Sequence, residues 1–390
     1  MKVVVDARGI RDGMTGVGYY TSHLVSELGA ARPNDQFVFL TLRKEGPALR
    51  PALRAPNAEW LEVDADYESH PAGDWWEHRA LPLLLDRIGA DVFHGPAFMV
   101  PYSLAPLFLP FSRGPARAGL VVTIHDLSVF TMPQGYPLLF RLYLRQVMRR
   151  SVRAAHRVIC PSAFTRDEAL RLWPNLPPGK FDVIPHAQAP CFQAAPPEDP
   201  GRLRARYNLP DKFLLMVGTF ESRKNPTFFR SLYDRLLPRL GGRTTPLVWV
   251  GSVGFGGREA LSNLRPLRDK GLFRLMGALP LEDLPGLYHT ATALVYPSLN
   301  EGFGLPLLEA MACGLPVLAA DTTCLPEVVG QGGRILPLER PEDWAGAIQA
   351  LLDDPGEMAQ ARDRALRWAA KFSWKRTARR TAEVYEEAAP

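Results

Sequence analysis

Short apolar runs alternate with longer amphipathic stretches along the whole chain, and this alternation is the feature that most constrains its fold. Each run has the length of one buried strand, and most of the intervening stretches have the length of a helix. The pattern predicts βαβ units and parallel sheets. We place strands at residues 3–6, 37–42, 91–94, 120–124, 158–160, 182–184, 213–217, 247–250, 273–276, 293–296 and 317–319.

The chain is too long for one ordinary hydrophobic core. Its 390 residues predict two domains, and the weakly periodic stretch 187–201 contains four prolines near the midpoint. We therefore predict an α/β protein with two doubly wound, Rossmann-like domains that face each other across a cleft. The expected bounds are 1–188 for the first domain, 189–202 for a linker, 203–372 for the second domain and 373–390 for a final segment.

Several classes of protein are disfavoured. Four cysteines lie scattered without metal-ligand spacing, which indicates reduced thiols in a cytoplasmic enzyme. Met1 leads directly into an apolar strand, so we expect no signal peptide. The longest apolar stretch, 91–111, is interrupted by His94 and four prolines, so we expect no membrane-spanning helix.

Positive charge is concentrated between residues 101 and 180, where 11 Lys and Arg stand against 3 acidic residues. On a helix, a spacing of four makes a basic stripe. A solvated helix face explains such a stripe, and so does attraction to anionic lipid headgroups or to an acceptor that carries phosphate. Nucleic acid is disfavoured because no recognition motif accompanies the charge. The stripe consists of Arg141, Arg145, Arg149, Arg153 and Arg157, with Arg150 beside them.

The segment 297–317 carries the most informative motif. A strand ends near its start, a glycine-bearing loop follows, and Pro306 suits the first turn of a helix. The backbone N–H groups at the start of that helix, together with its dipole, favour a phosphate or diphosphate. Glu301 in the loop and Glu309 in the helix can accept hydrogen bonds from sugar and ribose hydroxyls. Taken alone, the segment fits an ordinary turn and amphipathic helix equally well.

Two further loops follow predicted strands. Arg223 and Lys224 can neutralise a leaving diphosphate, although an Arg-Lys pair is usually solvated surface. His125 and Asp126 end a buried-looking strand of the first domain, where a histidine is commonly satisfied by a neighbouring backbone group.

Residues 301–317 read Glu-Gly-Phe-Gly-Leu-Pro-Leu-Leu-Glu-Ala-Met-Ala-Cys-Gly-Leu-Pro-Val and resemble the Glu-x7-Glu motif of the family 4 glycosyltransferases. The resemblance covers essentially the whole chain and is strongest over 213–330. It implies the GT-B fold, with an acceptor-side first domain and a second domain that binds the donor nucleotide sugar. It also implies that the last segment crosses back onto the first domain.

The resemblance assigns roles in the second domain. Glu301 would contact the donor sugar and Glu309 the ribose, and the amides around residues 304–307 would hold the distal phosphate. Residues 218–225 resemble the family's Gly-Thr-x-Glu-Pro-Arg-Lys-Asn loop, which favours Lys224 and, less firmly, Arg223 as diphosphate contacts. The expected donor-binding residues are Arg223, Lys224, Gly302, Phe303, Gly304, Leu305 and Glu309.

In the first domain, the resemblance places His125 against the donor sugar near its anomeric carbon, with Asp126 orienting His125 or its loop. Residues 15–20 resemble the family's flexible loop over the acceptor and donor phosphates, through Gly16 and Gly18. The expected catalytic residues are His125, Asp126 and Glu301.

Three other features carry weaker expectations. Asp64-Ala65-Asp66 resembles a metal-binding pair, but acidic neighbours indicate an exposed loop, and we expect neither a metal nor a cofactor. His94 could meet an acceptor or serve structure. Thr323 and Cys324 depart from the family pattern, and we expect no effect on the phosphate and sugar contacts.

The expected function is retaining transfer of a hexose to a saccharide or lipid-linked saccharide acceptor at the cytoplasmic membrane leaflet, in polysaccharide or glycoconjugate synthesis. GDP-mannose is the favoured donor, while UDP-glucose and UDP-N-acetylglucosamine remain open. Charge stabilisation without a glycosyl-enzyme intermediate is expected. The main rival is a non-catalytic sugar-nucleotide-binding subunit of a transferase complex, which would be expected to lack one or more charged site residues. A GT-B phosphorylase or epimerase is a further, weaker rival.

Overall fold

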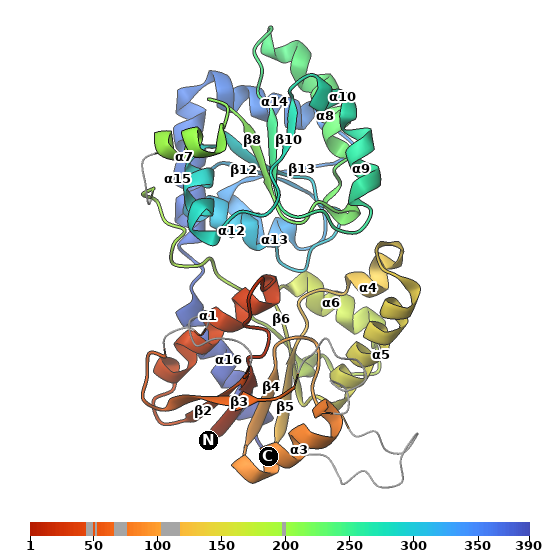
Figure 1. Cartoon of the computed structure of the whole chain (residues 1–390), viewed down its shortest axis with the longest axis vertical. Coiled ribbons are helices and arrows are strands. Elements are labelled where there is room, and N and C mark those ends of the chain that lie inside the picture. The colour runs from red at the N-terminus through yellow and green to blue at the C-terminus, as the bar shows by residue number, and fades with distance from the viewer. Residues whose placement is uncertain (44–49, 51–52, 66–75, 103–117, 197–199) are drawn as a thin grey trace. The chain divides into compact units, whose positions relative to one another are not determined.

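The computed structural model describes residues 1–43, 50, 53–65, 76–102, 118–196 and 200–390. The chain divides into two compact units. Unit 1 comprises Met1–Phe130, Leu138–His186 and Ser373–Pro390, and unit 2 comprises Thr131–Pro137 and Ala187–Phe372. Each unit has a sheet with helices on both faces (Figure 1).

Unit 1 has a parallel sheet with the strand order β3-β2-β1-β4-β5-β6-β7 in its described residues. Its strands are β1 (Lys2–Asp6), β2 (Gln36–Leu42), β3 (Ala58–Val63), β4 (Val92–Gly95), β5 (Gly119–Thr123), β6 (Arg157–Cys160) and β7 (Phe181–Val183). Its helices are α1 (Gly16–Ala31), α3 (Leu81–Ile88), α4 (Ser128–Thr131), α5 (Leu138–Ala154), α6 (Ala163–Leu172) and α16 (Trp374–Ala388), with shorter helical turns η2 (Trp76–Ala80) and η4 (Pro178–Lys180).

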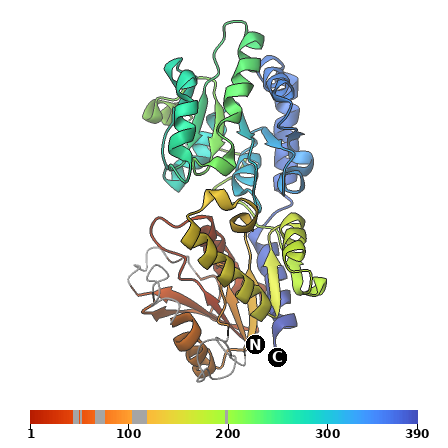
Figure 2. The ribbon, with the colours of Figure 1, turned by 90° about the vertical axis from the view of Figure 1, so that its right-hand side faces the viewer.

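Helix α16 belongs to unit 1 although it ends the chain. Its buried residues Trp374, Ala378, Ala382 and Tyr385 recur at helical spacing and form one apolar face. That face packs on α1 and on strands β5 and β6, while α5 contacts the sheet from the other side (Figures 1 and 2). The segment 373–390 thus completes the hydrophobic core of unit 1.

Unit 2 has a parallel sheet with the order β10-β9-β8-β11-β12-β13. Its strands are β8 (Leu214–Val217), β9 (Leu247–Val250), β10 (Phe273–Leu275), β11 (Ala293–Tyr296), β12 (Val317–Ala320) and β13 (Arg334–Leu336). Its helices are α7 (Pro200–Tyr207), α8 (Phe228–Leu236), α9 (Gly257–Asn263), α10 (Arg265–Asp269), α11 (Leu284–Thr290), α12 (Leu305–Ala312), α13 (Leu325–Val329), α14 (Pro341–Asp353) and α15 (Pro355–Ala369). Shorter turns are η3 (Pro133–Gly135), η5 (Ser222–Lys224), η6 (Leu237–Leu240), η7 (Leu281–Asp283) and η8 (Gly330–Gly332).

The strand order identifies where ligands are expected. In unit 1 the order reverses between β1 and β4, and in unit 2 between β8 and β11. Open α/β sheets bind ligands outside the carboxyl ends of the strands at such a switch point. The loops after β8 and β11 are therefore the first place to look for a site in unit 2.

The predicted α/β fold and its parallel sheets are confirmed, and each predicted strand corresponds to an observed one. Strands β3 and β13 were missed because both lie at a sheet edge, where partial exposure replaces a continuous apolar run. No helix in the described part of the chain is long and apolar enough to cross a membrane.

Candidate functional site

The two charged motifs of unit 2 lie at its switch point. Residues 218–225 follow β8 and residues 297–304 follow β11, and these two strands are hydrogen-bonded neighbours. The Leu299 N–H donates to the Arg223 carbonyl (2.8 Å), which ties one loop to the other. Motifs about 80 residues apart in the sequence are thus joined by the topology of the sheet.

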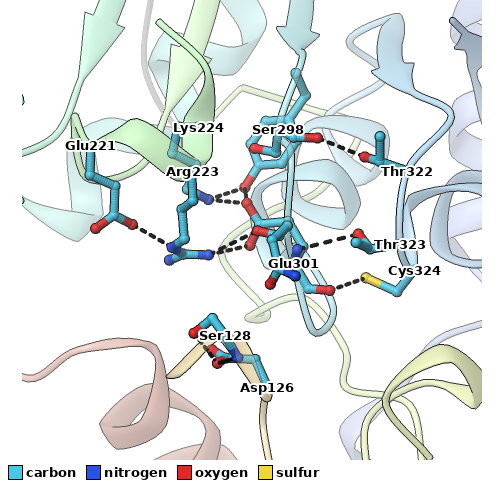
Figure 3. A network of polar contacts seen from close by, with 12 residues as sticks. Asp126, Ser128, Glu221, Arg223, Lys224, Ser298, Glu301, Thr322, Thr323 and Cys324 are labelled. Carbon is cyan, nitrogen blue, oxygen red and sulfur yellow. Dashed lines mark hydrogen bonds and ion pairs between the residues drawn. The ribbon is translucent and has the colours of Figure 1, made fainter. Parts of the chain in front are cut away.

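A buried ion cluster occupies this place (Figure 3). The Lys224 ammonium contacts Glu301 Oε1 and donates to the Tyr296 hydroxyl (2.5 Å). Arg223 donates to Glu301 Oε2 (2.9 Å) and also to Glu221 (2.5 Å). The Glu301 carboxylate therefore lies between two cations.

The electrostatics of the cluster keep Glu301 ionised. Burial alone would raise the pKa of Glu301, but the positive charges of Lys224 and Arg223 more than offset it and lower the pKa to about 2. Burial lowers the pKa of Lys224 from its usual value, and pairing with Glu301 partly opposes this. Two cations at a strand end, oriented by carboxylates, can attract a diphosphate.

Gly218 makes room for the lysine. Its φ of 134° lies in a region that other residues rarely adopt, and a Cβ there would meet Lys224 Cε at 3.2 Å. The glycine at the end of β8 thus lets the aliphatic part of Lys224 pass close to the backbone on its way to Glu301.

The backbone of Glu301 is fixed by the loop that follows β12. The Glu301 N–H donates to Thr323 Oγ1 (3.3 Å), and the Cys324 thiol donates to the Glu301 carbonyl (3.3 Å). Thr322, also in the loop after β12, donates to the Ser298 carbonyl in the loop after β11 (2.6 Å). Thr323 and Cys324, for which we expected no effect on the phosphate and sugar contacts, therefore both hold the backbone of the residue that carries the central carboxylate (Figure 3).

Helix α12 begins at Leu305, after Gly304 in a left-handed conformation (φ 87°) and without a side-chain cap. Pro306 has no N–H, and the Leu307 N–H donates to the Gly304 carbonyl (3.0 Å). The amides of Gly304 and Leu305 are then the better candidates for a phosphate than those of residues 306 and 307. Phe303 is buried against Phe372, so its ring serves packing.

Glu309, one turn into α12, is half-buried and accepts a hydrogen bond from the Tyr288 hydroxyl (2.7 Å) on α11. Burial raises the pKa of Glu309 to about 7, and the Tyr288 hydrogen bond partly offsets this rise. Tyr288 and Tyr296 were missed by sequence reasoning. Each lies in an apolar segment, where the sequence predicts a tyrosine of the hydrophobic core. The hydrogen-bond partner of its hydroxyl becomes visible only in the folded structure.

In unit 1, His125 and Asp126 follow β5 as expected. His125 Nε2 lies 2.8 Å from the Pro96 carbonyl, so it carries the proton, and Nδ1 accepts from His186 Nε2 (3.2 Å). Burial lowers the pKa of His125 to about 4, so the ring is neutral at pH 7. Tyr20 packs edge-on against His125.

Asp126 acts on its own loop. Its Oδ1 accepts from the Ser128 N–H (2.9 Å) and hydroxyl (2.5 Å), which fixes the start of α4. Of the two roles expected for Asp126, the observed contacts therefore support orienting the loop.

His94 serves structure. It is fully buried, with Nδ1 2.7 Å from the Tyr385 hydroxyl and Nε2 2.8 Å from Thr123 Oγ1. Burial lowers its pKa to about 3. These contacts join β4 and β5 to α16 and favour the structural reading over contact with an acceptor.

Three sequence-based expectations differ from the structure or concern residues that the structure does not describe. Gly16 and Gly18 stand in the first turns of α1 and not in a loop, and a Cβ on Gly18 would lie 2.6 Å from the Gly9 carbonyl oxygen. Arg157 is not part of a helical stripe, because α5 ends at residue 154 and Arg157 starts β6, paired with Asp182 and Glu387. Asp66 of the acidic pair lies outside the described residues, and Asp64 is exposed beside Arg43.

Comparison with known proteins now adds to this geometry. Residues 202–368 match the family model of glycosyl transferases group 1, and residues 14–187 match that of glycosyltransferase family 4. The O-antigen chain mannosyltransferase B of Escherichia coli is 31% identical, over 99% of this chain and 100% of the relative.

Solved structures agree in fold. Sucrose-phosphate synthase from Thermosynechococcus elongatus superposes with a TM-score of 0.72 and 21% identity, covering 99% of this chain and 98% of that one. The Anabaena protein HepE in complex with UDP-glucose gives a TM-score of 0.67 and 19% identity over 99% of both chains. At this level of identity, the two structures speak for the fold alone.

Proposed function

Because this chain belongs to the family 4 glycosyltransferases and has the GT-B fold, we propose that it transfers a hexose from a nucleoside diphosphate sugar to a saccharide or lipid-linked saccharide acceptor. The resemblance to this family is confirmed by the two family models and by the full-length relative. We further propose that the transfer proceeds with retention at the anomeric carbon and serves polysaccharide or glycoconjugate synthesis.

The observation that carries this proposal is the buried cluster of Lys224, Arg223 and Glu301 at the switch point of unit 2. A carboxylate held ionised between two cations supplies both parts of a donor site. The cations can hold the diphosphate, and the carboxylate can accept hydrogen bonds from sugar hydroxyls. Glu309, with the start of α12 one turn away, supplies a second acceptor for the ribose and amides for the distal phosphate.

The proposed reaction breaks the bond between the anomeric carbon and the diphosphate oxygen, and the electron pair leaves with the diphosphate. Lys224, Arg223 and the amides of Gly304 and Leu305 stabilise that charge. The acceptor hydroxyl forms the new bond from the same face, and its proton passes to the departing phosphate oxygen. As the family resemblance implies, we propose that neutral His125 orients the donor sugar, while Asp126 holds the loop that carries His125.

Mannose is the favoured sugar because the full-length relative is a mannosyltransferase, and GDP-mannose is the corresponding donor. UDP-sugars are the alternative, since HepE binds UDP-glucose. We propose that the chemistry needs no metal, as the family resemblance implies. A lipid-linked acceptor would place the enzyme at the cytoplasmic face of a membrane.

A thermal-shift panel tests the donor site. GDP-mannose, UDP-glucose, UDP-N-acetylglucosamine and the free diphosphates are compared in EDTA and then in magnesium. A ligand at about 100 times its dissociation constant adds about 2.7 kcal/mol of stability. We expect one base class to stabilise the protein in EDTA and Glu309→Ala to abolish the effect. If no donor binds at millimolar concentration, the proposed function fails.

Product analysis separates the enzyme from the non-catalytic alternative. A catalytic chain releases the nucleoside diphosphate and forms an α-linked product from an α-linked donor, whereas a binding subunit shows a thermal shift without turnover. A covalent adduct trapped with a fluorosugar donor would contradict the proposed mechanism.

A further inference from the structure

Helix α5 presents an unusual outer face at its N-terminal end. Leu139 is 82% exposed, Leu138 57% and Leu142 52%, and Phe140 beside them is 45% exposed. An isolated exposed leucine needs no explanation, but a cluster of four large apolar side chains on one helix turn does. We call the set Leu138, Leu139, Phe140 and Leu142, together with Arg149 and Arg153, the α5 surface.

Helical geometry shows that most of these side chains share one face. At about 100° per residue, Leu138, Leu142, Arg149 and Arg153 lie within about 60° of one another around the axis. Val147, Met148, Ser151 and Val152 are all buried, and of these Val147 and Ser151 lie on the opposite face. The helix therefore packs on one side and exposes a second group of apolar side chains on another.

The charge around this patch has one sign. No acidic residue occurs between Asp126 and Asp167 in the sequence, so α5 carries arginines without any carboxylate of its own. Arg145 is committed to the unit 1 backbone, donating to the Val129 and Phe130 carbonyls (2.9 and 3.1 Å). Arg149 and Arg153 are exposed on the leucine face. The patch thus combines apolar side chains with two exposed arginines, of which Arg149 also lies over the Phe130 ring (5.7 Å).

The combination of exposed leucines and arginines indicates which kind of partner the α5 surface binds. A symmetric contact between two copies would bring the same arginines of each copy together, which opposes association. A purely solvated face does not explain the leucines. An anionic lipid surface accounts for both features, because leucines enter the boundary of the acyl chains while arginines meet phosphate groups.

We propose that the α5 surface docks this protein on an anionic membrane, with Leu138, Leu139 and Leu142 inserted and Arg149 and Arg153 at the headgroups. The proposal rests on the proposed function, in which the acceptor is linked to a lipid and therefore lies at a membrane. The docking itself is a property of α5 that can be measured without any donor or acceptor.

Sedimentation with vesicles tests the proposal, using phosphatidylcholine alone and an equal mixture with phosphatidylglycerol, without nucleotide sugar. We expect binding to the mixed vesicles and a loss of binding at high salt. Leu139→Ser/Leu142→Ser should weaken partitioning by about tenfold per leucine, and Arg149→Ser/Arg153→Ser by about fivefold per arginine. Far-UV circular dichroism verifies that each variant is folded.

Matched controls separate the surface from general charge and hydrophobicity. Leu83→Ser removes an exposed leucine of α3 (49% exposed), and Arg265→Ser/Arg268→Ser removes two exposed arginines of α10. Both should bind like the wild type. Equal binding to neutral vesicles, equal losses in the controls, or a concentration-dependent dimer that the leucine variant abolishes would each overturn the proposal.

The outcome is distinguishable from failure of the proposed function. The leucine variant should keep its thermal shift with donor nucleotide and its transfer to a soluble acceptor. A protein that binds vesicles but no donor supports docking and refutes the transferase proposal, and the reverse result refutes docking alone.

Discussion

At the scale of single residues, the candidate site depends on which charges are satisfied before any ligand arrives. Glu301 is buried and would be costly to ionise alone, but Lys224 and Arg223 stabilise it on both oxygens. A buried charge cluster contributes little net stability relative to apolar packing, although removing one partner is costly. The cluster is therefore better explained by a role in binding the donor than by a contribution to stability.

The substitution Lys224→Ala tests this role in donor binding. The substitution removes one of two cations from Glu301 and from the proposed diphosphate contact. We expect turnover at saturating donor to fall by about 10²- to 10³-fold and stability to fall by about 2–3 kcal/mol, since Arg223 still pairs with Glu301. Steady-state kinetics and urea unfolding measure the two effects. Lys270→Ala, which removes an exposed lysine, is the control, and a turnover loss below tenfold in Lys224→Ala would contradict the assigned role.

Glu309 predicts a dependence of stability on pH. Its pKa is raised to about 7 in the native state from 4.5, so between these values the native state binds more protons than the unfolded chain. Stability contributed by this proton is present below about pH 4.5 and is lost as pH rises through about 7. Allowing for its partial exposure, we expect Glu309→Gln to exceed the wild type by about 2 kcal/mol at pH 8 and to match it near pH 4.5. Urea unfolding at both pH values measures this, and an equal difference at both would refute the raised pKa.

The charged residues of the candidate site could be predicted from the sequence because local motifs carry them. The Glu-x7-Glu spacing and the Arg-Lys pair are visible within short windows. The hydroxyls that complete the site are not. Tyr288 reaches Glu309 from 21 residues away, and Thr323 reaches Glu301 from the loop of a neighbouring strand. Such contacts require the sheet to be assembled first.

At the scale of elements, the start of α12 depends on one glycine. Gly304 has a φ of 87°, and a Cβ there would meet Leu307 Cδ1 at 3.0 Å. Gly304→Ala should destabilise the protein by about 1–2 kcal/mol and weaken donor binding, because it disturbs the turn that orients the proposed phosphate amides. Gly346→Ala in the interior of α14, where a Cβ has open space, should stabilise by about 0.5–1 kcal/mol.

Chemical denaturation and calorimetric titration of donor measure these two variants. An unchanged donor affinity in Gly304→Ala would show that the start of α12 takes no part in the site.

Local patterns failed where tertiary pairing decided the element. The resemblance of residues 15–20 to the family's flexible loop predicts a loop, yet α1 begins at Gly16, and Tyr20 on that helix is buried beside His125 and Trp374. The four-residue spacing of arginines continues to Arg157, but the helix ends at residue 154. Strand β6 then pairs with β5 and β7, and Arg157 meets Asp182 on the neighbouring strand. In both cases a long-range contact overrides the local period.

At the scale of the whole molecule, the two compact units are not two consecutive halves of the sequence. The last helix, α16, belongs to the first unit. Trp374 stacks near His186 and His23, and Tyr385 lies 2.7 Å from His94 at the heart of the sheet. The cores of the two units therefore differ in their need for the C-terminal segment, since unit 2 is built entirely from residues before Ser373.

Deletion of residues 373–390 should thus affect the two units unequally. It removes Trp374, Ala378, Ala382 and Tyr385 from the core of unit 1 and leaves His94 buried without its tyrosine partner. Losses of about 3–5 kcal/mol for one large aromatic side chain alone approach the stability of a domain. We expect unit 1 to unfold while unit 2 stays folded, so that a thermal transition and the nucleoside diphosphate shift of unit 2 survive but transfer is abolished. Hydrogen exchange resolved by segment distinguishes the units: loss of protection in β1, β4 and β5 with retention in β8 and β11 is the expected result. Simultaneous loss of protection in both sheets would show that the two cores fold as one.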